Sequence, residues 1–258
     1  STPSRAALLT GRYAERAGLQ GVVDDLSVNG LESDEFTLAD YLKQNNYATG
    51  IFGKWHLGCL PEHLPLRHGF NEFFGLPYSN DMWPFHPQPG HPYRALPLYD
   101  NERVVEYNPT VNHMTTRITE RATAFIDKHK NEPFLLYVPY TQPHVPLGVS
   151  DKFKGKSGEG LYADVIMEID WSVGEIMKTL KENGLDDHTL VLFTSDNGPW
   201  LSYGNHGGST GGLREGKGTT FEGGQRVPFI ARMPGRIPAG KVSEQFLSAL
   251  DITPTIVE

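Results

Sequence analysis

Polar side chains that can bind an anion or a metal ion follow three hydrophobic segments of the sequence. Lys54 and His56 come after the first segment, His144 after the second, and the neighbouring Asp196 and Asn197 after the third. Lysine and imidazole suit an anionic substrate, and carboxylate and amide oxygens suit a hard cation such as calcium. A lone lysine is usually a surface charge and Asp-Asn-Gly is a common turn, so each residue alone has an ordinary explanation. Together they favour a functional site.

The segments that must position these residues alternate between strand and helix patterns. Hydrophobic runs predict four strands, at 48–52, 134–138, 189–194 and 227–231. Helix-start signals and helical spacing of apolar residues predict four helices, at about 3–10, 37–45, 114–126 and 161–180. This order predicts an α/β fold with a mainly parallel sheet and helices on both faces. Ligands of such sheets bind beyond the carboxyl ends of the strands, where the polar residues lie.

Length and composition limit the class of protein. A chain of 258 residues is long enough for one large α/β domain and does not require a second. The net charge of −8 argues against nucleic acid as the main partner, because phosphate binding needs a basic face. No apolar run approaches the roughly 20 residues of a membrane span. Cys59 is the single cysteine, so no intrachain disulfide forms and the redox compartment stays open.

The region between Leu57 and Asn112 is rich in proline and aromatic residues and shows no sustained period. We expect a long excursion over the core. Several of its side chains could stack on a sugar ring or hydrogen-bond to it: Trp83, Phe85, His86, His91 and Arg94. A packed, proline-rich cover over the sheet explains any one of them equally well.

Two long motifs resemble the signatures of a known family. Ser1–Arg12, with the pattern Ser-x-Pro-Ser-Arg-x-x-x-Leu-Thr-Gly-Arg, resembles the first signature of type I sulfatases, and Gly53–Gly58 resembles the second. The resemblance continues in order along nearly the whole chain, at 75–79, 142–144, 195–198 and 216–224. The chain looks most like the arylsulfatase and N-acetylgalactosamine-sulfatase branch. The resemblance implies an alkaline-phosphatase-like fold.

The resemblance also implies where the chain lies within the family's catalytic domain. Residues 1–258 would be that domain without its first strand, which would precede Ser1, and without its C-terminal subdomain. The sequence opens abruptly at Ser1 and stops at Glu258 inside a predicted helix. We therefore expect that both ends are cut.

Ser1 occupies the position of the family's nucleophile. In type I sulfatases, that residue is a formylglycine that a sulfatase-maturing enzyme makes from cysteine or serine. One hydroxyl of the hydrated aldehyde attacks sulfur, and the other later expels sulfate. Plain serine could at best form a stable sulfate ester, so turnover requires oxidation of Ser1. Three explanations of the serine stay open: a serine-type sulfatase matured by an anaerobic bacterial enzyme, an engineered cysteine-to-serine trap, or an inactive chain.

The resemblance assigns roles to the other polar residues. Arg5 would hold the formylglycine hydroxyl. The groups that would contact the sulfate oxygens are Lys54, His56, Ser79 and Lys217. His56 is also a candidate to take the diol proton, and His144 to protonate the departing alcohol, with Lys217 as its competitor. His206 is a candidate for substrate binding, although an ordinary loop histidine is an equally good explanation.

A divalent cation is the implied cofactor. Asp196 and Asn197 resemble two ligands of the family's metal ion, usually calcium, and the Ser1 side chain would be a third. The family's remaining ligands, a pair of aspartates upstream of Ser1, are absent from this sequence. The sequence therefore supplies only part of the ligand set that the resemblance implies.

These observations predict hydrolysis of a sulfate monoester, on a sulfated carbohydrate or on an aryl sulfate as a surrogate. A phosphonate or phosphodiester hydrolase of the same superfamily is the nearest alternative enzyme. A non-catalytic binder of sulfated glycans is the alternative if Ser1 is never oxidised. The expected compartment is the periplasm or the exterior, or the lysosome in a eukaryote.

Overall fold

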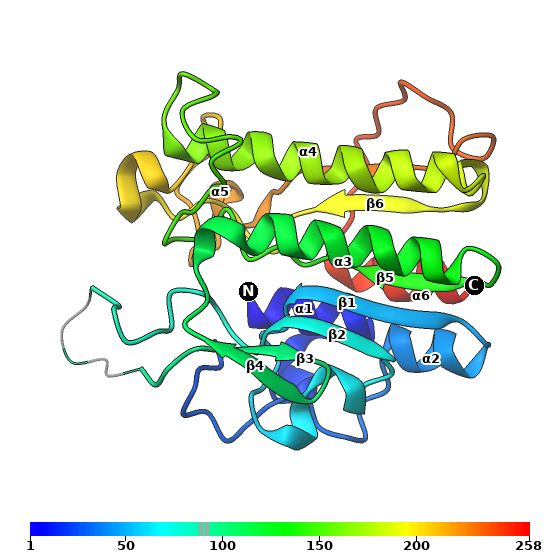
Figure 1. Ribbon diagram of the computed structural model, residues 1–258, viewed down its shortest axis with the longest axis horizontal. Helices are drawn as coiled ribbons and strands as arrows, with labels where there is room; N and C mark the ends of the chain where they lie inside the picture. Colours follow the sequence, from blue (N-terminus) through cyan, green and yellow to red (C-terminus); the bar gives the residue numbers. More distant parts are fainter. Residues whose placement is uncertain (88–89, 91–92) are drawn as a thin grey trace.

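The computed structural model describes residues 1–87, 90 and 93–258 and has a five-stranded sheet at its centre (Figure 1). The strand order is β4-β3-β2-β1-β5, with β1 at Ala48–Lys54, β2 at Glu72–Leu76, β3 at Pro97–Asp100, β4 at Arg103–Tyr107 and β5 at Phe134–Tyr137. β1 runs parallel to both β2 and β5, and β3 and β4 add an antiparallel edge. Every residue of β1 is buried, as expected for a parallel strand covered on both faces.

Helices cover both faces of this sheet. Successive side chains of a strand point to opposite faces, so Phe52 joins a hydrophobic cluster with Ile118 and Phe125 of α3, whereas Ile51 joins a cluster with residues of α1 and α2. The six helices of the described residues are α1 (Thr2–Thr10), α2 (Leu38–Gln44), α3 (Met114–His129), α4 (Leu161–Glu182), α5 (Glu222–Gln225) and α6 (Ile252–Val257). The predicted α/β class, with a mostly parallel sheet between helices, is confirmed.

Local signals fix the helix ends that the sequence predicts. Thr37 and Asp40 form the predicted capping box of α2, since each side chain bonds to the other's backbone N–H. Gly11 ends α1 in the left-handed conformation, at φ 65°. Short 3₁₀ helices fill many connections: η1 (Ala14–Ala17), η2 (Pro61–His63), η3 (Pro65–Arg67), η4 (Val111–His113), η5 (Asp186–His188), η6 (Leu201–His206) and η7 (Ala249–Asp251).

The C-terminal third differs from the expectation of one continuous sheet. β6 (Val191–Thr194) and β7 (Phe229–Arg232) lie where strands are predicted, but they pair antiparallel with each other in a separate two-stranded sheet. Between them runs a glycine-rich segment with the short η6 and the four-residue α5, not the long helix of a parallel crossover. α4 lies beside α3 and packs over this part of the molecule (Figure 1).

The excursion between Leu57 and Asn112 contains three strands that the sequence pattern misses. β2, β3 and β4 are four or five residues long. Each has an interrupted apolar run: β2 contains Gly75, β3 begins at Pro97, and β4 carries Arg103 and Glu106. β2 matters most for function, because it pairs along the whole second half of β1 and aligns Lys54 with Leu76.

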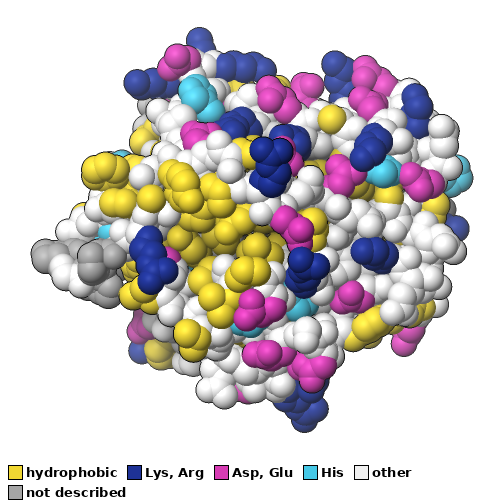
Figure 2. Space-filling model, turned by 60° about the horizontal axis from the view of Figure 1, so that its bottom comes forward, with side chains coloured by type: hydrophobic (Ala, Val, Ile, Leu, Met, Phe, Trp, Pro, Cys, Tyr) yellow, Lys and Arg dark blue, Asp and Glu magenta, His cyan; other side chains and the backbone are white. Residues whose placement is uncertain are grey.

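The face shown in Figure 2 carries charged side chains of both signs. On the face shown in Figure 2, lysine and arginine side chains are interspersed with acidic ones, and hydrophobic side chains gather near the middle. This face offers no continuous basic stripe of the kind that binds nucleic acid. Within the described residues, every helix is too short or too polar to cross a membrane.

Candidate active site

Ser1, Lys54 and Asn197 meet at the carboxyl end of β1. Ser1 lies at the N-terminus of α1, and its Oγ is 3.4 Å from the Nζ of Lys54, which ends β1. The same Oγ donates to Oδ1 of Asn197 at 3.4 Å. The structure therefore brings together the predicted nucleophile, one predicted sulfate contact and one predicted metal ligand, at the sheet edge where ligands bind.

Arg5 and Asp196 form a partly buried ion pair beside Ser1. Nε and Nη2 of Arg5 donate to Oδ2 of Asp196 at 3.1 and 2.9 Å, and Nη1 donates to the carbonyl oxygen of Lys54 at 2.6 Å. Burial opposes ionisation of Asp196, but the charges of Arg5 and Lys54 outweigh it and hold the pKa of Asp196 well below its usual range. Arg5 thus fixes both the Asp196 carboxylate and the end of β1.

His56 has a strained backbone and a defined tautomer. Its φ of 62° lies in the left-handed region, which non-glycine residues rarely occupy. Thr2 Oγ1 donates to the His56 carbonyl at 2.9 Å, and His56 Nε2 donates to the Val23 carbonyl at 3.0 Å. Nδ1 is buried without a partner among the described residues. Burial and the positive charge of Lys54 lower the pKa of His56 well below its usual value, so the ring is neutral with a free lone pair on Nδ1.

Lysine charges in the site are destabilised by burial. Burial, with the charge of Arg5, lowers the pKa of Lys54 to about 7. Burial also lowers the pKa of Lys217, although the Asp81 and Asp196 carboxylates oppose the shift. A bound anion would raise the pKa of both lysines, because its negative charge stabilises their protonated form.

His144 and Lys217 form a second polar pair. Nδ1 of His144 donates to the Val145 carbonyl at 2.6 Å, and Lys217 Nζ lies 2.8 Å from Nε2. Burial, with the charge of Lys54, lowers the pKa of His144 to about 4. A neutral imidazole with its proton on Nδ1 can only accept at Nε2, so Lys217 is the donor. Lys217 also lies over the ring of Trp200, with Nζ 4.2 Å from the ring centroid.

The two predicted substrate-binding residues differ in placement. Ser79 is buried, and its Oγ has no partner among the described residues. His206 is exposed at the end of η6. Of the predicted sugar-contacting side chains, Phe85 and Arg94 are exposed and Trp83 and His86 are half-buried. His91 lies outside the described residues.

Three residues that sequence reasoning missed contribute to the site. Asp81 is buried beside His144, with Oδ1 3.9 Å from Nδ1 of the ring. Trp200 packs against the same ring at a centroid distance of 5.5 Å. Thr2 holds the His56 backbone. A polar residue near the end of β2 would have been a signal for Asp81, but β2 itself went unpredicted.

The residues present supply only part of a cation site. Asp196, Asn197 and Ser1 offer three oxygen donors close together, and one carboxylate oxygen of Asp196 is already held by Arg5. Calcium takes six to eight oxygen ligands in proteins. Within the described residues, no group of three or more histidine, cysteine, aspartate or glutamate side chains could hold a metal ion. The set is thus compatible with one side of a cation site and does not complete it.

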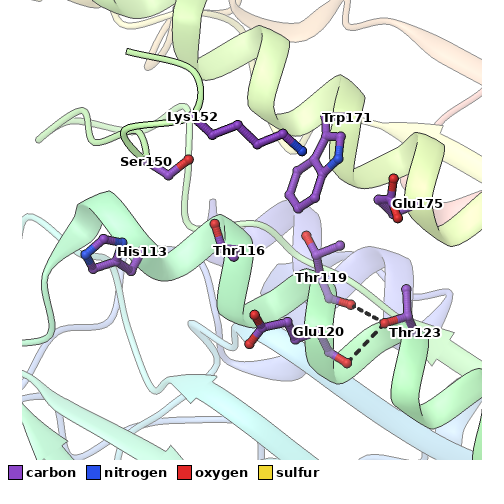
Figure 3. Close-up of a pocket in the computed structure, with 9 residues that line it drawn as sticks. All are labelled: His113, Thr116, Thr119, Glu120, Thr123, Ser150, Lys152, Trp171 and Glu175. Carbon is purple, nitrogen blue, oxygen red and sulfur yellow. Dashed lines mark hydrogen bonds between the residues drawn. The ribbon is translucent and has the colours of Figure 1, made fainter.

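A cleft between α3 and α4 lies away from these residues. Helices α3 and α4 enclose a cleft of about 420 Å³ whose walls carry Thr116, Glu120, Lys152, Trp171 and Glu175 (Figure 3). Lys152 approaches the ring of Trp171, with Nζ 4.1 Å from its centroid. None of the predicted catalytic residues lines this cleft. The candidate site is therefore defined by converging side chains and not by cavity size.

Comparison with known proteins gives consistent matches over the whole chain. The family model described as "Sulfatase" matches residues 1–258. Arylsulfatase A of Bos taurus is 43% identical, with 99% of this chain and 54% of that protein aligned. N-acetylgalactosamine-6-sulfatase of Canis lupus familiaris is 40% identical, with 98% of this chain and 52% of that protein aligned. The chain thus spans about half the length of the curated relatives it matches.

Solved structures agree with this result. The crystal structure of Ps i-CgsB in complex with k-i-k-neocarrahexaose superposes with a TM-score of 0.86 at 35% identity. The match covers 100% of this chain and 60% of the solved one. The similarity therefore extends from the sequence motifs to the arrangement of strands and helices described above.

Proposed function

Because this chain belongs to the sulfatase family, we propose that it is the catalytic part of an enzyme that hydrolyses sulfate monoesters through Ser1 in its oxidised form. One observation carries the proposal. Ser1 and Arg5 lie at the N-terminal end of α1 and Lys54 ends β1, and the three meet in one site, with Lys217 close enough to lower the pKa of Lys54. Such a concentration of buried positive charge next to a nucleophile position suits a tetrahedral anion.

Ser1 would supply the nucleophile after modification by a sulfatase-maturing enzyme. Formylglycine at this position would provide a hydrated aldehyde, in which one hydroxyl attacks sulfur and the other later releases sulfate. Lys54 donates to Oγ of Ser1, and Arg5 anchors the carbonyl of Lys54. These contacts fix the position of the side chain at residue 1 relative to Lys54. Less conformational entropy is then lost when the reacting groups align.

His56 is the base that this geometry favours. Its Nε2–H is committed to the Val23 carbonyl, and its neutral Nδ1 keeps a free lone pair in the buried site. A proton released from the hydroxyl groups at position 1 can be held at that atom. Two hydrogen bonds keep Nδ1 of His56 in place: Thr2 donates to the His56 carbonyl, and the ring donates to the Val23 carbonyl.

Lys217 is the proton donor that we assign to the departing alcohol, with His144 as its orienting partner. The ammonium of Lys217 donates to Nε2 of neutral His144. A buried lysine with a lowered pKa transfers a proton more readily than a solvated one, and it also neutralises the developing alkoxide. Ser79 would contact a sulfate oxygen, and its buried hydroxyl, which has no partner among the described residues, supports this role.

A divalent cation would be held by Asp196, Asn197 and the side chain at position 1, completed by further oxygen ligands. These three donors alone do not complete the coordination of such an ion. Calcium is the expected ion for a set made only of oxygen atoms. A sulfated carbohydrate is the proposed substrate class, and the proposed compartment is the periplasm, the lysosome or the exterior.

The test is to co-express the chain with a sulfatase-maturing enzyme and to measure both modification and turnover. Oxidation of the Ser1 side chain lowers the mass of its peptide by about two hydrogens. The oxidised protein is expected to hydrolyse 4-nitrophenyl sulfate faster than 4-nitrophenyl phosphate or a phosphonate monoester, and Lys54→Met should abolish this activity. Faster phosphoester turnover would reverse the choice of substrate. An oxidised protein that binds sulfated glycans without turnover would make it a binding protein.

A further inference from the structure

Three consecutive residues after β2 carry buried polar atoms that no described residue satisfies. These atoms are Oγ of Ser79, Oδ1 of Asn80 and Oδ1 of Asp81. Buried polar groups in proteins almost always have a hydrogen-bond partner, so three orphans in a row are unusual. Ser79 belongs to the proposed sulfate pocket, whereas Asp81 has no role in the reaction described above.

Asp81 lies next to the reacting groups. Its side chain approaches the Nδ1 edge of His144, and Lys217 lies at the Nε2 edge of the same ring. Only one imidazole ring therefore separates Asp81 from the group that protonates the leaving oxygen. Asp81 also follows β2, which is paired with β1 beside Lys54, so both residues lie at the same edge of the sheet.

The neighbouring histidines do not satisfy the Asp81 carboxylate. The Oδ1–Nδ1 distance to His144 is 3.9 Å and the Oδ2–Nε2 distance to His86 is 4.0 Å, both too long for hydrogen bonds. Nδ1 of His144 already donates to the Val145 carbonyl. A carboxylate that is only 8% exposed and can only accept requires a donor from elsewhere.

The surroundings select the kind of donor. Lys54, Lys217 and His144 all feel the field of Asp81, so an additional ammonium group would be repelled by the two lysines. A neutral hydroxyl meets no such repulsion. Partly exposed aromatic rings stand nearby: Trp200 packs on His144, and Tyr203 packs on Trp200 at a centroid distance of 4.7 Å. A carboxylate among aromatic faces is the combination that binds sugar rings, whose C–H faces stack while their hydroxyls donate.

We infer that Asp81 recognises the alcohol half of the substrate, by accepting a hydrogen bond from a sugar hydroxyl close to the sulfate ester. This rests on the proposed sulfatase function and deepens it, because it makes sulfated sugars with a free neighbouring hydroxyl the preferred substrates over aryl sulfates. Asp81 is thus a specificity-determining residue.

The sign of one substitution separates this role from a purely electrostatic one. Asp81→Asn removes a negative charge near the sulfate pocket, and by charge alone every sulfate ester should then bind more tightly. Loss of the charged hydrogen-bond acceptor should instead weaken binding, and only for ligands that carry a hydroxyl next to Asp81. A hydrogen bond to a charged group corresponds to a loss of roughly tenfold or more in affinity.

The experiment is calorimetric titration of the chain with unmodified Ser1, which does not turn the ligand over. The probes are galactose 6-sulfate, N-acetylgalactosamine 6-sulfate and phenyl sulfate. We expect the unsubstituted chain to prefer at least one sugar. In Asp81→Asn, that sugar should lose about tenfold or more in affinity, while phenyl sulfate binds as well as before or better. Asp34→Asn, at an exposed position, is the matched control, and thermal melting checks that each variant is folded.

Each other result has a definite meaning. Unchanged or tighter sugar binding by Asp81→Asn overturns the inference, as does an equal loss for phenyl sulfate, which would assign Asp81 to positioning His144. A chain that prefers neither sugar also overturns it. Failure of the unsubstituted chain to bind even phenyl sulfate would show that the sulfate pocket itself is wrong, and the proposed function would then fail with it. If Asp81→Asn does not fold, Asp81→Ser serves with the same probes.

Discussion

The protonation state of His144 offers the sharpest check on the proposed proton path. Burial, helped by the charge of Lys54, lowers the pKa of this ring from 6.5 to about 4. Between these two values, the unfolded chain carries a proton on His144 that the folded chain lacks. The unfolded state then binds more protons, so this residue reduces folding stability as the pH falls through the window.

The size of the effect follows from the two pKa values. One pKa unit corresponds to about 1.36 kcal/mol, and at pH 5 the unfolded histidine is almost fully protonated while the folded one is almost fully neutral. His144 alone should therefore lower the free energy of unfolding by about 2 kcal/mol between pH 7.5 and pH 5. That is a sizeable fraction of the 5 to 15 kcal/mol typical of a domain.

Urea denaturation at pH 7.5 and pH 5 measures this quantity when the chain is compared with His144→Gln. Other buried histidines titrate in both proteins, so their contributions cancel in the difference. We expect the unsubstituted chain to lose about 2 kcal/mol more than the variant on acidification. An NMR titration should place the midpoint of His144 near pH 4. Equal losses in the two proteins, or a midpoint at or above 6.5, would mean that His144 is the charged donor and that Lys217 accepts.

Two further predictions concern the framework of the site. Asp196→Asn leaves the buried guanidinium of Arg5 without its ionic partner, so the free energy of unfolding in urea should fall by about 3 kcal/mol; a change below 1 kcal/mol would show that the pair does not stabilise the fold. In Gly53→Ala, the new Cβ would lie 2.0 Å from the Pro139 carbonyl oxygen at a φ of 139°, so thermal unfolding followed by circular dichroism should shift down strongly. Gly21→Ala is the control, because nothing lies within 4 Å of its added Cβ, and equal melting of the two variants would contradict the close approach.

Sequence patterns predicted the candidate site residues that follow the hydrophobic runs predicted as strands. β1 is a seven-residue segment with no exposed position, so its hydrophobic run is unmistakable, and the rule about carboxyl strand ends then points directly to Lys54 and His56. The same rule works less directly for Asp196. β6 is a strand, as predicted, but it belongs to a separate antiparallel pair. Asp196 lies near Ser1 because its carboxylate accepts a hydrogen bond from Arg5 of α1.

Residues that follow β2 were missed because a glycine interrupts the hydrophobic run of that strand. β2 has five residues, and Gly75 within it reads as a breaker. The structure shows the opposite reason for that glycine: a Cβ there would lie 1.7 Å from the carbonyl oxygen of Gly53 on the paired strand. Without β2, nothing marks 79–81 as a strand end. Ser79 was therefore assigned only through family resemblance, and Asp81 was not assigned.

Contacts between loops depend on packing that no local pattern encodes. His144 and Lys217 are separated by 73 positions, yet their side-chain nitrogens lie 2.8 Å apart. Trp200 lies between the two residues in the packing: its ring contacts the imidazole of His144, and the ammonium of Lys217 lies over its face. A sequence can show that each of these residues is suited to acid catalysis. Which of the two holds the proton depends on burial and on the Val145 carbonyl that fixes the tautomer, and both are properties of the folded chain.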